Sequence, residues 1–272
     1  MHGLGNDFML IDARSRELAL SREKIAALAD RHTGVGFDQL LILENPADGS
    51  SDAAYRVFNA DGTEVEQCGN GVRCIARYLG DSDCFTATEL SLQGAAGKIS
   101  AKLLNAGQVE VSMGEPDFDP AALPFAAEAA AERYQLTLDE SGDNVEIGAV
   151  SMGNPHAVLL CSQALDQVPV NAMGAAISGH SRFPRQTNVE FMQLLDPRNI
   201  VVRVYERGVG ETMACGTGAC AAVAMGRHWG LLDEKVKVAL PGGTLEISWR
   251  GPGSSLFMRG PAVDVFGGKI EI

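Results

Sequence analysis

The sequence predicts an α+β protein made of two similar halves. Six segments show the β-branched enrichment or the alternation of apolar and polar residues that is typical of strands: 98–103, 109–113, 189–195, 200–205, 236–240 and 245–249. Turn-length joints at 105–107 and 241–243 favour antiparallel hairpins over parallel crossovers. Helical patterns are fewer, and a repeated motif relates the first half to the second. Strands joined by short turns, with few helices, indicate the α+β class.

Two segments outside these strands carry further structural signals. Ser21 is placed to cap a helix that carries Ile25 and Leu28, and Gly34 is expected to end it. The segment 115–131 is rich in Pro, Asp and Ala and is the best candidate for a connection between domains. With 272 residues, the chain is long enough for two domains of ordinary size.

The most informative feature is an internal repeat. Phe58 is followed ten residues later by Cys68-Gly69-Asn70-Gly71, and Tyr205 is followed ten residues later by Cys215-Gly216-Thr217-Gly218. The two cysteines are 147 residues apart, and nearby offsets of 148 and 149 superpose Gly5-Asn6 on Gly153-Asn154 and Gln39 on Asn188. Matches in the same order at nearly one offset indicate two similar halves, each with one Cys-Gly-x-Gly corner.

A helix is expected after each corner. Val72, Ile75, Ala76 and Leu79 recur at helical spacing, and Gly80 follows as a stop signal. The second pattern, 219–225, is apolar nearly all round, so this helix belongs inside its domain. The N-terminus of such a helix would open on an interior or interface site rather than on bulk water.

A cysteine at a helix N-terminus has chemical consequences. The helix end carries roughly half a positive charge and unpaired N–H groups, so it holds a carboxylate and lowers the pKa of a thiol from about 8.5. The flanking glycines let the backbone approach the bound anion closely. If the halves pack about a pseudo-twofold axis, a carboxylate held between both helix ends presents its α-carbon with one thiol on each side. One thiolate and one thiol then suit inversion at that carbon, because a proton taken from one face is replaced on the other.

The composition excludes several classes of function. A formal net charge of −13 without a Lys/Arg cluster argues against nucleic acid as a partner. No apolar run approaches the roughly 20 residues of a membrane span, and no secretory signal is visible, so the cytoplasm is the expected location. The six cysteines contain no Cys-x-x-Cys, and the five histidines lack the usual zinc spacing, so no metal is expected. Four of the cysteines are interpreted as core residues: Cys74, Cys84, Cys161 and Cys220.

The sequence gives weaker support to a cofactor-dependent enzyme or to a protein without catalytic activity. The segment 216–221 fits G-x-G-x-x-A, but no strand leads directly into it, so a dinucleotide site is not favoured. The six lysines lie outside the glycine motifs, which disfavours a pyridoxal enzyme, and no cofactor is expected. A redox or anion-binding module is the non-enzyme alternative, since two facing thiols can serve as a switch. The polar residues matched in both halves argue against it.

Three further polar residues are candidates for the site. His156 is equally consistent with a hydrogen-bonded loop histidine and with a group that lines the site. Glu206 and Arg207 end an apolar strand, and the repeat places Glu206 opposite Asn59, which favours a binding role. Arg207 suits a second carboxylate through bidentate geometry.

Together these residues resemble the diaminopimelate epimerase family. The likeness extends over nearly the whole chain, through Met1-His2-Gly3-Leu4-Gly5-Asn6-Asp7-Phe8, Gly34-Val35-Gly36-Phe37-Asp38-Gln39, Phe58-Asn59-Ala60-Asp61-Gly62, Cys68-Gly69-Asn70-Gly71-Val72-Arg73-Cys74, Gly153-Asn154-Pro155-His156, Thr187-Asn188-Val189-Glu190-Phe191, Glu206-Arg207-Gly208 and Cys215-Gly216-Thr217-Gly218-Ala219-Cys220. Either cysteine corner alone would also suit the related proline racemases.

The resemblance implies an α+β fold of two pseudosymmetric domains, each a mostly antiparallel sheet wrapped around a central helix, with the active site in the cleft between the domains. The expected domains are residues 1–114, to which 262–272 return, and residues 115–261. The implied activity is the cofactor-independent conversion of LL- to meso-2,6-diaminopimelate, an isomerase step in the biosynthesis of lysine and peptidoglycan precursors. A homodimer is implied as well, although Phe266 stands where family members commonly have a tyrosine associated with the dimer contact.

The resemblance also implies roles for individual residues. Cys68 and Cys215 would be the acid and the base, and His156 and Glu206 would support catalysis. The residues implied to bind the substrate are Asn6, Gln39, Asn59, Gly69, Asn70, Asn154, Asn188, Glu206, Arg207, Gly216 and Thr217.

Overall fold

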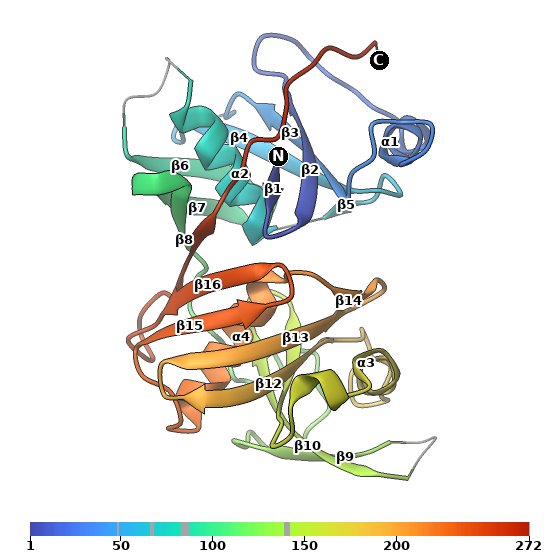
Figure 1. Ribbon diagram of the computed structural model, residues 1–272, viewed down its shortest axis with the longest axis vertical. Helices are drawn as coiled ribbons and strands as arrows, with labels where there is room; N and C mark the ends of the chain where they lie inside the picture. The colour runs from blue at the N-terminus through green and yellow to red at the C-terminus, as the bar shows by residue number, and fades with distance from the viewer. Residues whose placement is uncertain (48, 66–67, 83–86, 139–141, 272) are drawn as a thin grey trace. The chain divides into compact units, whose positions relative to one another are not determined.

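A computed structural model describes residues 1–47, 49–65, 68–82, 87–138 and 142–271 (Figure 1). The chain forms two compact units. Unit 1 comprises Met1–Ser112 and Arg259–Ile272, and unit 2 comprises Met113–Met258. Cys84, which the sequence analysis interprets as a core residue, lies outside the described residues.

Unit 1 contains a mixed sheet in which antiparallel pairs predominate. Its strands are β1 (His2–Gly3), β2 (Asn6–Asp12), β3 (Gln39–Glu44), β4 (Ala53–Asn59), β5 (Glu64–Val65), β6 (Glu89–Gly94), β7 (Gly97–Leu103) and β8 (Gln108–Ser112). The pairs β1–β2, β3–β4, β4–β5, β6–β7 and β7–β8 are antiparallel, whereas β2–β3 and β4–β6 are parallel. The short 3-10 helix η1 (Asn105–Gly107) joins β7 to β8, which confirms the hairpin predicted there.

Helix α1 (Arg22–Ala29) begins where the sequence predicts and ends earlier than expected. The Ser21 hydroxyl accepts a hydrogen bond from the Lys24 N–H at 3.2 Å, so the predicted N-cap is confirmed. The helix stops five residues before Gly34, the expected stop signal. A Cβ atom at Gly34 would lie 2.3 Å from the Ala27 carbonyl oxygen. The glycine therefore lets the chain return closely over the end of the helix.

Helix α2 (Gly69–Gly80) is the core of unit 1. Val72, Ile75 and Leu79 are each 0% exposed, and the helix ends at Gly80, as predicted. The helix contacts β1, β2, β3, β7 and β8, so strands from both ends of the sheet pack around it.

Unit 2 contains a second mixed sheet. Its strands are β9 (Tyr134–Thr137), β10 (Asn144–Ser151), β11 (Pro155–Leu160), β12 (Asn188–Asp196), β13 (Asn199–Glu206), β14 (Gly210–Thr212), β15 (Lys235–Leu240) and β16 (Gly243–Ser248), and β17 (Phe257–Pro261) carries the chain back to unit 1. The pairs β9–β10, β10–β11, β12–β13, β13–β14 and β15–β16 are antiparallel, and β11–β12 and β13–β15 are parallel. The predicted hairpin at 241–243 is the turn between β15 and β16.

Helix α4 (Gly216–His228) has the central place in unit 2. Ten of its residues are buried, and it contacts β10, β11, β12, β13 and β16, which confirms a helix that is apolar nearly all round. Two shorter helices complete the unit, η2 (Leu165–Gln167) and α3 (Val170–Ser178), and α3 packs against β12 and β13 (Figure 1).

The two units share one pairing pattern. The series β1, β2, α1, β3, β4, β5, α2, β6, β7 corresponds element by element to β10, β11, α3, β12, β13, β14, α4, β15, β16. Parallel and antiparallel pairs fall at the same places in both series. The sequence repeat is therefore a structural repeat of a sheet around one central helix.

The Pro-rich segment 115–131 differs from its predicted role as a connection. Leu123 and Phe125 are 1% and 5% exposed and belong to the apolar core of unit 2, together with Tyr134 and Ile147. The segment is part of that unit because its apolar side chains are buried there.

The C-terminal segment is fixed to the first strand of unit 1. The His2 N–H donates to the Val263 carbonyl at 2.9 Å, and the Val263 N–H donates back to His2 at 3.0 Å. Arg73 of α2, itself 0% exposed, donates from Nε to the Pro261 carbonyl at 3.2 Å.

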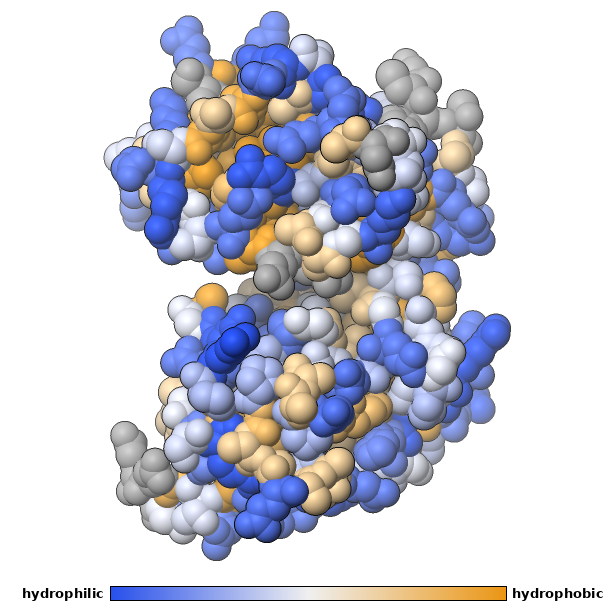
Figure 2. Space-filling model, turned by 180° about the vertical axis from the view of Figure 1, so that it is seen from behind, coloured by the Kyte–Doolittle hydropathy of each residue, from blue (hydrophilic) through white to orange (hydrophobic). Residues whose placement is uncertain are grey.

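Hydrophilic residues cover most of the face seen in Figure 2, with hydrophobic patches between them. Among the residues that the structure describes, no helix combines the length and the apolar character needed to cross a bilayer.

Candidate active site

Cys68 and Cys215 occupy the same structural position, the N-cap of the central helix of each unit. Both residues are extended, with φ/ψ of −143°/102° and −111°/114°. The Cys68 carbonyl accepts from the Val72 N–H and the Cys215 carbonyl from the Ala219 N–H, both at 3.0 Å. Neither cysteine is in a disulfide. Each thiol is thus attached to the positive end of a helix.

The second glycine of each corner has a packing role that the sequence analysis did not predict. A Cβ atom at Gly71 would lie 2.8 Å from Leu41 Cδ2, and one at Gly218 would lie 2.9 Å from Glu190 Oε1. These glycines therefore allow the helix to approach the strand beneath it closely, where a larger residue would force the side chain of Leu41 or Glu190 to shift.

In unit 1 the predicted polar residues form two hydrogen-bonded pairs. Asn70, in the first turn of α2 after Gly69, donates from Nδ2 to Asn6 Oδ1 at 3.2 Å. Gln39 and Asn59 are register partners on β3 and β4, and Gln39 Nε2 donates to Asn59 Oδ1 at 3.0 Å.

Unit 2 contains the equivalent pairs. Asn154 Nδ2 lies 3.5 Å from the hydroxyl oxygen of Thr217, which follows Gly216 in the first turn of α4. Asn188 Oδ1 accepts from the Arg207 N–H at 2.9 Å, next to Glu206 at the end of β13. The repeat relates Asn6 to Asn154 and Asn70 to Thr217, and the contact between these two positions recurs in both units. Gln39 corresponds to Asn188, but Gln39 donates to the Asn59 side chain whereas Asn188 accepts from the Arg207 backbone N–H.

The residues that hold Asn6 in place were not among the sequence candidates. Asn6 Nδ2 donates to Asp38 Oδ2 at 3.1 Å, and Arg31 bridges Asp38 and Asp7 with N–O distances of 2.7 and 2.8 Å. The hydrogen bond from Arg31 is the largest cause that lowers the pKa of Asp7. Asp7 and Asp38 both lie in the quoted motifs, but no pattern in the sequence indicated that a shared arginine brings them together.

The environment of Cys215 differs from the one expected of a helix N-terminus. Cys215 is 5% exposed, and burial raises the pKa of its thiol well above 9.0, with Glu206 adding to the rise. The Thr217 hydroxyl, 3.5 Å from Sγ, and the Gly218 N–H oppose this rise. For Cys215 the expected lowering by the helix end is therefore outweighed by burial and by neighbouring carboxylates.

His156 is a buried, hydrogen-bonded residue. It is 0% exposed, and its Nδ1 lies 2.7 Å from Oε1 of Glu190, which is also 0% exposed. Its Nε2 lies 2.9 Å from Asn154 Oδ1. The chain of contacts continues through Thr217 to Cys215. The sequence analysis did not identify Glu190 as a site residue. Its position was a signal, because a carboxylate two residues after Asn188 in an apolar strand lies on the same face as Asn188.

Glu206 and Arg207 project from the end of β13 with different exposure. Glu206 is half-buried and accepts from the Thr212 hydroxyl at 2.5 Å. Arg207 is exposed, donates to the Arg185 carbonyl at 3.1 Å, and forms no ion pair with a carboxylate of the described residues. Its guanidinium is therefore available to an anionic ligand.

The other described cysteines lie away from the helix ends. Cys74 and Cys220 are 0% exposed, as a core position requires, and burial raises the pKa of Cys74 to about 12. Cys161 is half-buried against the core of unit 2. Among the described residues, no group of three or more His, Cys, Asp or Glu side chains is arranged to hold a metal ion.

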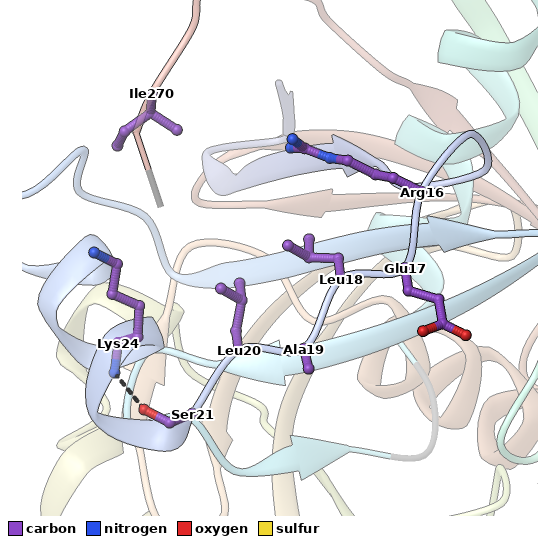
Figure 3. Close-up of a pocket in the computed structure, with 8 residues that line it drawn as sticks. All are labelled: Arg16, Glu17, Leu18, Ala19, Leu20, Ser21, Lys24 and Ile270. Atoms are coloured by element: carbon purple, nitrogen blue, oxygen red, sulfur yellow. Dashed lines mark hydrogen bonds between the residues drawn. The ribbon is translucent and has the colours of Figure 1, made fainter.

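A shallow pocket elsewhere in unit 1 contains none of the predicted site residues (Figure 3). Its volume is about 560 Å³. It is lined by Arg16, Glu17, Leu18, Ala19, Leu20, Ser21, Lys24 and Ile270. The hydrogen bond between Ser21 and Lys24 beside this pocket is the N-cap of α1.

Comparison with known proteins supports one family and one fold. The family model of diaminopimelate epimerase matches residues 1–118 and 148–265. A diaminopimelate epimerase from Nitrosospira multiformis is 51% identical over 272 residues, which are 100% of this chain and 97% of that protein.

Two solved structures share the fold at low identity. A phenazine biosynthesis protein of the PhzF family from Bacillus anthracis has a TM-score of 0.70 at 18% identity, over 100% of this chain and 95% of that one. A hydroxyproline epimerase from Agrobacterium vitis, solved with bound trans-4-hydroxy-L-proline, has a TM-score of 0.69 at 15% identity, over 96% and 87% of the chains. With the full-length similarity at 51% identity and the family match over most of the sequence, the chain belongs to the diaminopimelate epimerase family.

Proposed function

We propose that this protein converts LL-2,6-diaminopimelate to meso-2,6-diaminopimelate without a cofactor, as an isomerase in the biosynthesis of lysine and peptidoglycan precursors. The observation that carries the proposal is the recurrence, in both units, of one cysteine at a central helix N-terminus beside the same polar pairs. The full-length relative that bears the name diaminopimelate epimerase supports the choice of substrate.

In the proposed mechanism the substrate α-carbon binds with the Cys68 thiol on one face and the Cys215 thiol on the other. One thiolate removes the α-proton, and the electron pair of the broken C–H bond stays on the α-carbon. The other thiol then gives its proton to the opposite face, and its electron pair stays on sulfur as a new thiolate. The N–H groups at both helix ends hold the carboxylate and stabilise the negative charge that spreads into it.

The pKa directions support an assignment of the resting state. Because burial and Glu206 raise the pKa of Cys215, this residue rests as the thiol and donates the proton. Cys68 is then the base that removes the α-proton. His156 and Glu206 support Cys215, since His156 is linked to it through Asn154 and Thr217 and Glu206 disfavours its thiolate.

The two ends of the substrate are bound by different groups. The backbone N–H groups of Gly69, Asn70, Gly216 and Thr217 hold the carboxylate at the reacting end, with Asn6 and Asn154 beside them. Arg207 binds the carboxylate at the far end, and Gln39, Asn59, Asn188 and Glu206 bind amino groups.

We further propose a cytoplasmic homodimer. Free thiols at both catalytic positions fit a reducing compartment. The C-terminal segment of unit 1 exposes four large apolar side chains within eight residues, Val263 at 40%, Val265 at 61%, Phe266 at 72% and Ile270 at 42%. Clustered exposed apolar residues are typical of a protein interface.

The direct test of the activity is incubation with LL-diaminopimelate in heavy water without added cofactor. Meso product is expected to carry deuterium at the inverted carbon, while early recovered substrate carries little, because the abstracting thiol returns the original hydrogen and the opposite thiol delivers one from solvent. Mass spectrometry after chiral separation measures both. Inversion of proline in place of diaminopimelate would select a racemase, and no inversion of either would refute the proposal.

Each thiol is expected to be necessary. Cys68→Ala and Cys215→Ala should each lower kcat by roughly 10³-fold or more, and the double variant should lose little beyond either single change, because the two residues act as a unit. Cys161→Ala, which removes a half-buried thiol of unit 2, is the matched control and should stay near wild type. A Cys68→Ala enzyme of near-normal rate would contradict the two-thiol mechanism.

Arg207→Met is expected to lower kcat/KM for diaminopimelate roughly 10²-fold, because loss of a bidentate partner leaves the far carboxylate desolvated and unpaired. Arg198→Met, which breaks an exposed ion pair with Asp233 in the same unit, is the control and should change little. Steady-state kinetics measure kcat/KM for both variants. An unchanged kcat/KM in Arg207→Met would show that Arg207 is a solvated residue that does not bind the substrate.

The raised pKa of Cys215 predicts how its alkylation depends on pH. The thiolate fraction, and with it the rate of reaction with iodoacetamide, increases as the pH approaches the raised pKa. Glu206→Gln removes a carboxylate that raises this pKa, so the rise in rate should shift to lower pH. Glu146→Gln, an exposed partner of Arg133, should leave the profile unchanged. Mass spectrometry of the Cys215 peptide gives the rates, and identical profiles for Glu206→Gln and wild type would refute this account.

Phe266→Glu is expected to convert the dimer to a monomer in sedimentation equilibrium, because it places a charge within an apolar contact. Leu195→Glu, at an exposed apolar position of unit 2, is the control and should remain dimeric. A monomeric wild-type protein would refute the dimer, and a dimeric Phe266→Glu variant would remove the C-terminal segment from the interface.

A further inference from the structure

One position of the repeated fold is apolar in unit 1 and ionisable in unit 2. In the parallel pair β2–β3, Phe8 is opposite Gln39, and in the equivalent pair β11–β12, His156 is opposite Asn188. Two residues further along β3 and β12 lie Leu41 and Glu190. The pair of Phe8 and Leu41 in unit 1 therefore corresponds to the pair of His156 and Glu190 in unit 2.

Both pairs lie directly beneath the cysteine-bearing helix. A Cβ atom at Gly71 would lie 2.8 Å from Leu41 and 3.5 Å from Phe8, and one at Gly218 would lie 2.9 Å from Glu190 Oε1. Phe8 is 4% exposed, and Leu41, His156 and Glu190 are 0% exposed. Unit 1 thus shows that an apolar pair fills this place in the same fold, so the fold alone does not require ionisable groups there.

The ionisable pair is costly as a purely structural element. Glu190 Oε2 is buried and has no hydrogen-bond partner among the described residues. A buried polar atom without a partner is typically destabilising, and replacement of a buried ion pair by apolar residues of similar volume is often neutral or stabilising. A function that needs the carboxylate explains why it is retained in the fold despite this cost.

The contacts of His156 indicate what the carboxylate does. Each ring nitrogen faces an oxygen, Glu190 Oε1 at 2.7 Å from Nδ1 and Asn154 Oδ1 at 2.9 Å from Nε2. Burial raises the pKa of the Glu190 carboxyl, and the charge and hydrogen bond of His156 oppose the rise. Because Asn154 Oδ1 can only accept, the contact at Nε2 requires a proton on that nitrogen, and the contact between Nδ1 and Oε1 requires a proton between those two atoms.

We propose that Glu190 is a positioning residue of the proton-donating half: by holding His156 with a proton on Nε2, it orients Asn154 and Thr217 beside the Cys215 thiol. The steps of this chain are Nε2 to Asn154 at 2.9 Å, Asn154 to Thr217 at 3.5 Å and Thr217 to Cys215 Sγ at 3.5 Å. The inference rests on the proposed epimerase function. It adds a residue that is not itself in contact with the reacting atoms.

Two sets of variants test the proposal. Glu190→Gln keeps the size of the side chain but removes the acid group, so kcat should fall about tenfold or more while KM changes little, because loss of the group that fixes the protonation and orientation of the His156 ring slows proton transfer. The double variant His156→Phe/Glu190→Leu installs the pair that unit 1 contains. It should fold with a Tm at or near that of wild type and have a kcat as low as that of His156→Phe alone.

A spectroscopic readout separates positioning from packing. In ¹⁵N spectra of histidine-labelled protein, the His156 signals are identified by their loss in His156→Phe. Wild type should show Nε2 protonated, and Glu190→Gln should show a neutral ring with altered shifts at both nitrogens. Glu146→Gln, which removes a carboxylate of β10 outside this chain of contacts, should change neither the spectrum nor kcat.

The outcomes distinguish the proposal from its alternatives. Wild-type kcat in Glu190→Gln or in the double variant would overturn the positioning role, as would a wild-type His156 ring that lacks a proton on Nε2. A low kcat in Glu190→Gln with an unchanged Tm and altered ring signals would support it. If wild type does not invert diaminopimelate, the proposed function fails, while the ring spectra still test whether Glu190 sets the protonation of His156.

Discussion

The close approach of each central helix to its own sheet is the constraint on which the rest of the structure depends. At Gly71 and at Gly218 an added Cβ atom would press on a side chain of the strand beneath, so the glycines let the helix N-terminus seat closely on the sheet in each unit. The thiol at the N-cap takes its position from that seating. The polar residues at the ends of neighbouring strands then lie around the same helix end, because strands and helix are packed as one body.

In the mechanism we propose, repetition of this arrangement supplies two proton-transfer groups, and differences between the copies give them different tasks. Inversion requires one group that accepts a proton and one that donates it. In unit 2 the thiol is buried near Glu206 and Glu190, and both raise its pKa. In unit 1 the corresponding places hold Asn59 and Leu41, which are uncharged. The two similar units thus differ in the charges around their thiols, which fits the proposed roles of Cys215 as the acid and Cys68 as the base.

The glycines of the corners illustrate how one residue type serves two physical purposes. In the sequence, glycine beside cysteine indicates an anion site, since backbone N–H groups can then reach the ligand. In the structure, glycine as the third helical residue also serves a purpose internal to the protein, since a Cβ atom there would press on Leu41 or Glu190. A substitution there would therefore impair helix packing and displace the thiol, even if the anion site itself were intact.

The sequence by itself determined the elements with a strong local signal. The cap at Ser21, the helices after Cys68 and Cys215, the hairpins at 105–107 and 241–243 and the division into two similar halves all follow from periodicity, capping and repetition, which act over a few residues. Several candidate polar residues of each half were also recognisable, since they recur at offsets of 147 to 149 residues. Tertiary structure decided what depends on neighbours distant in the chain. It ended α1 at Ala29, placed the Pro-rich segment in the core of unit 2, and buried Cys215 so deeply that the helix end no longer sets its pKa. It also joined His156 to Glu190 across 34 residues. Burial and long-range contact set these features, and neither can be read from local pattern.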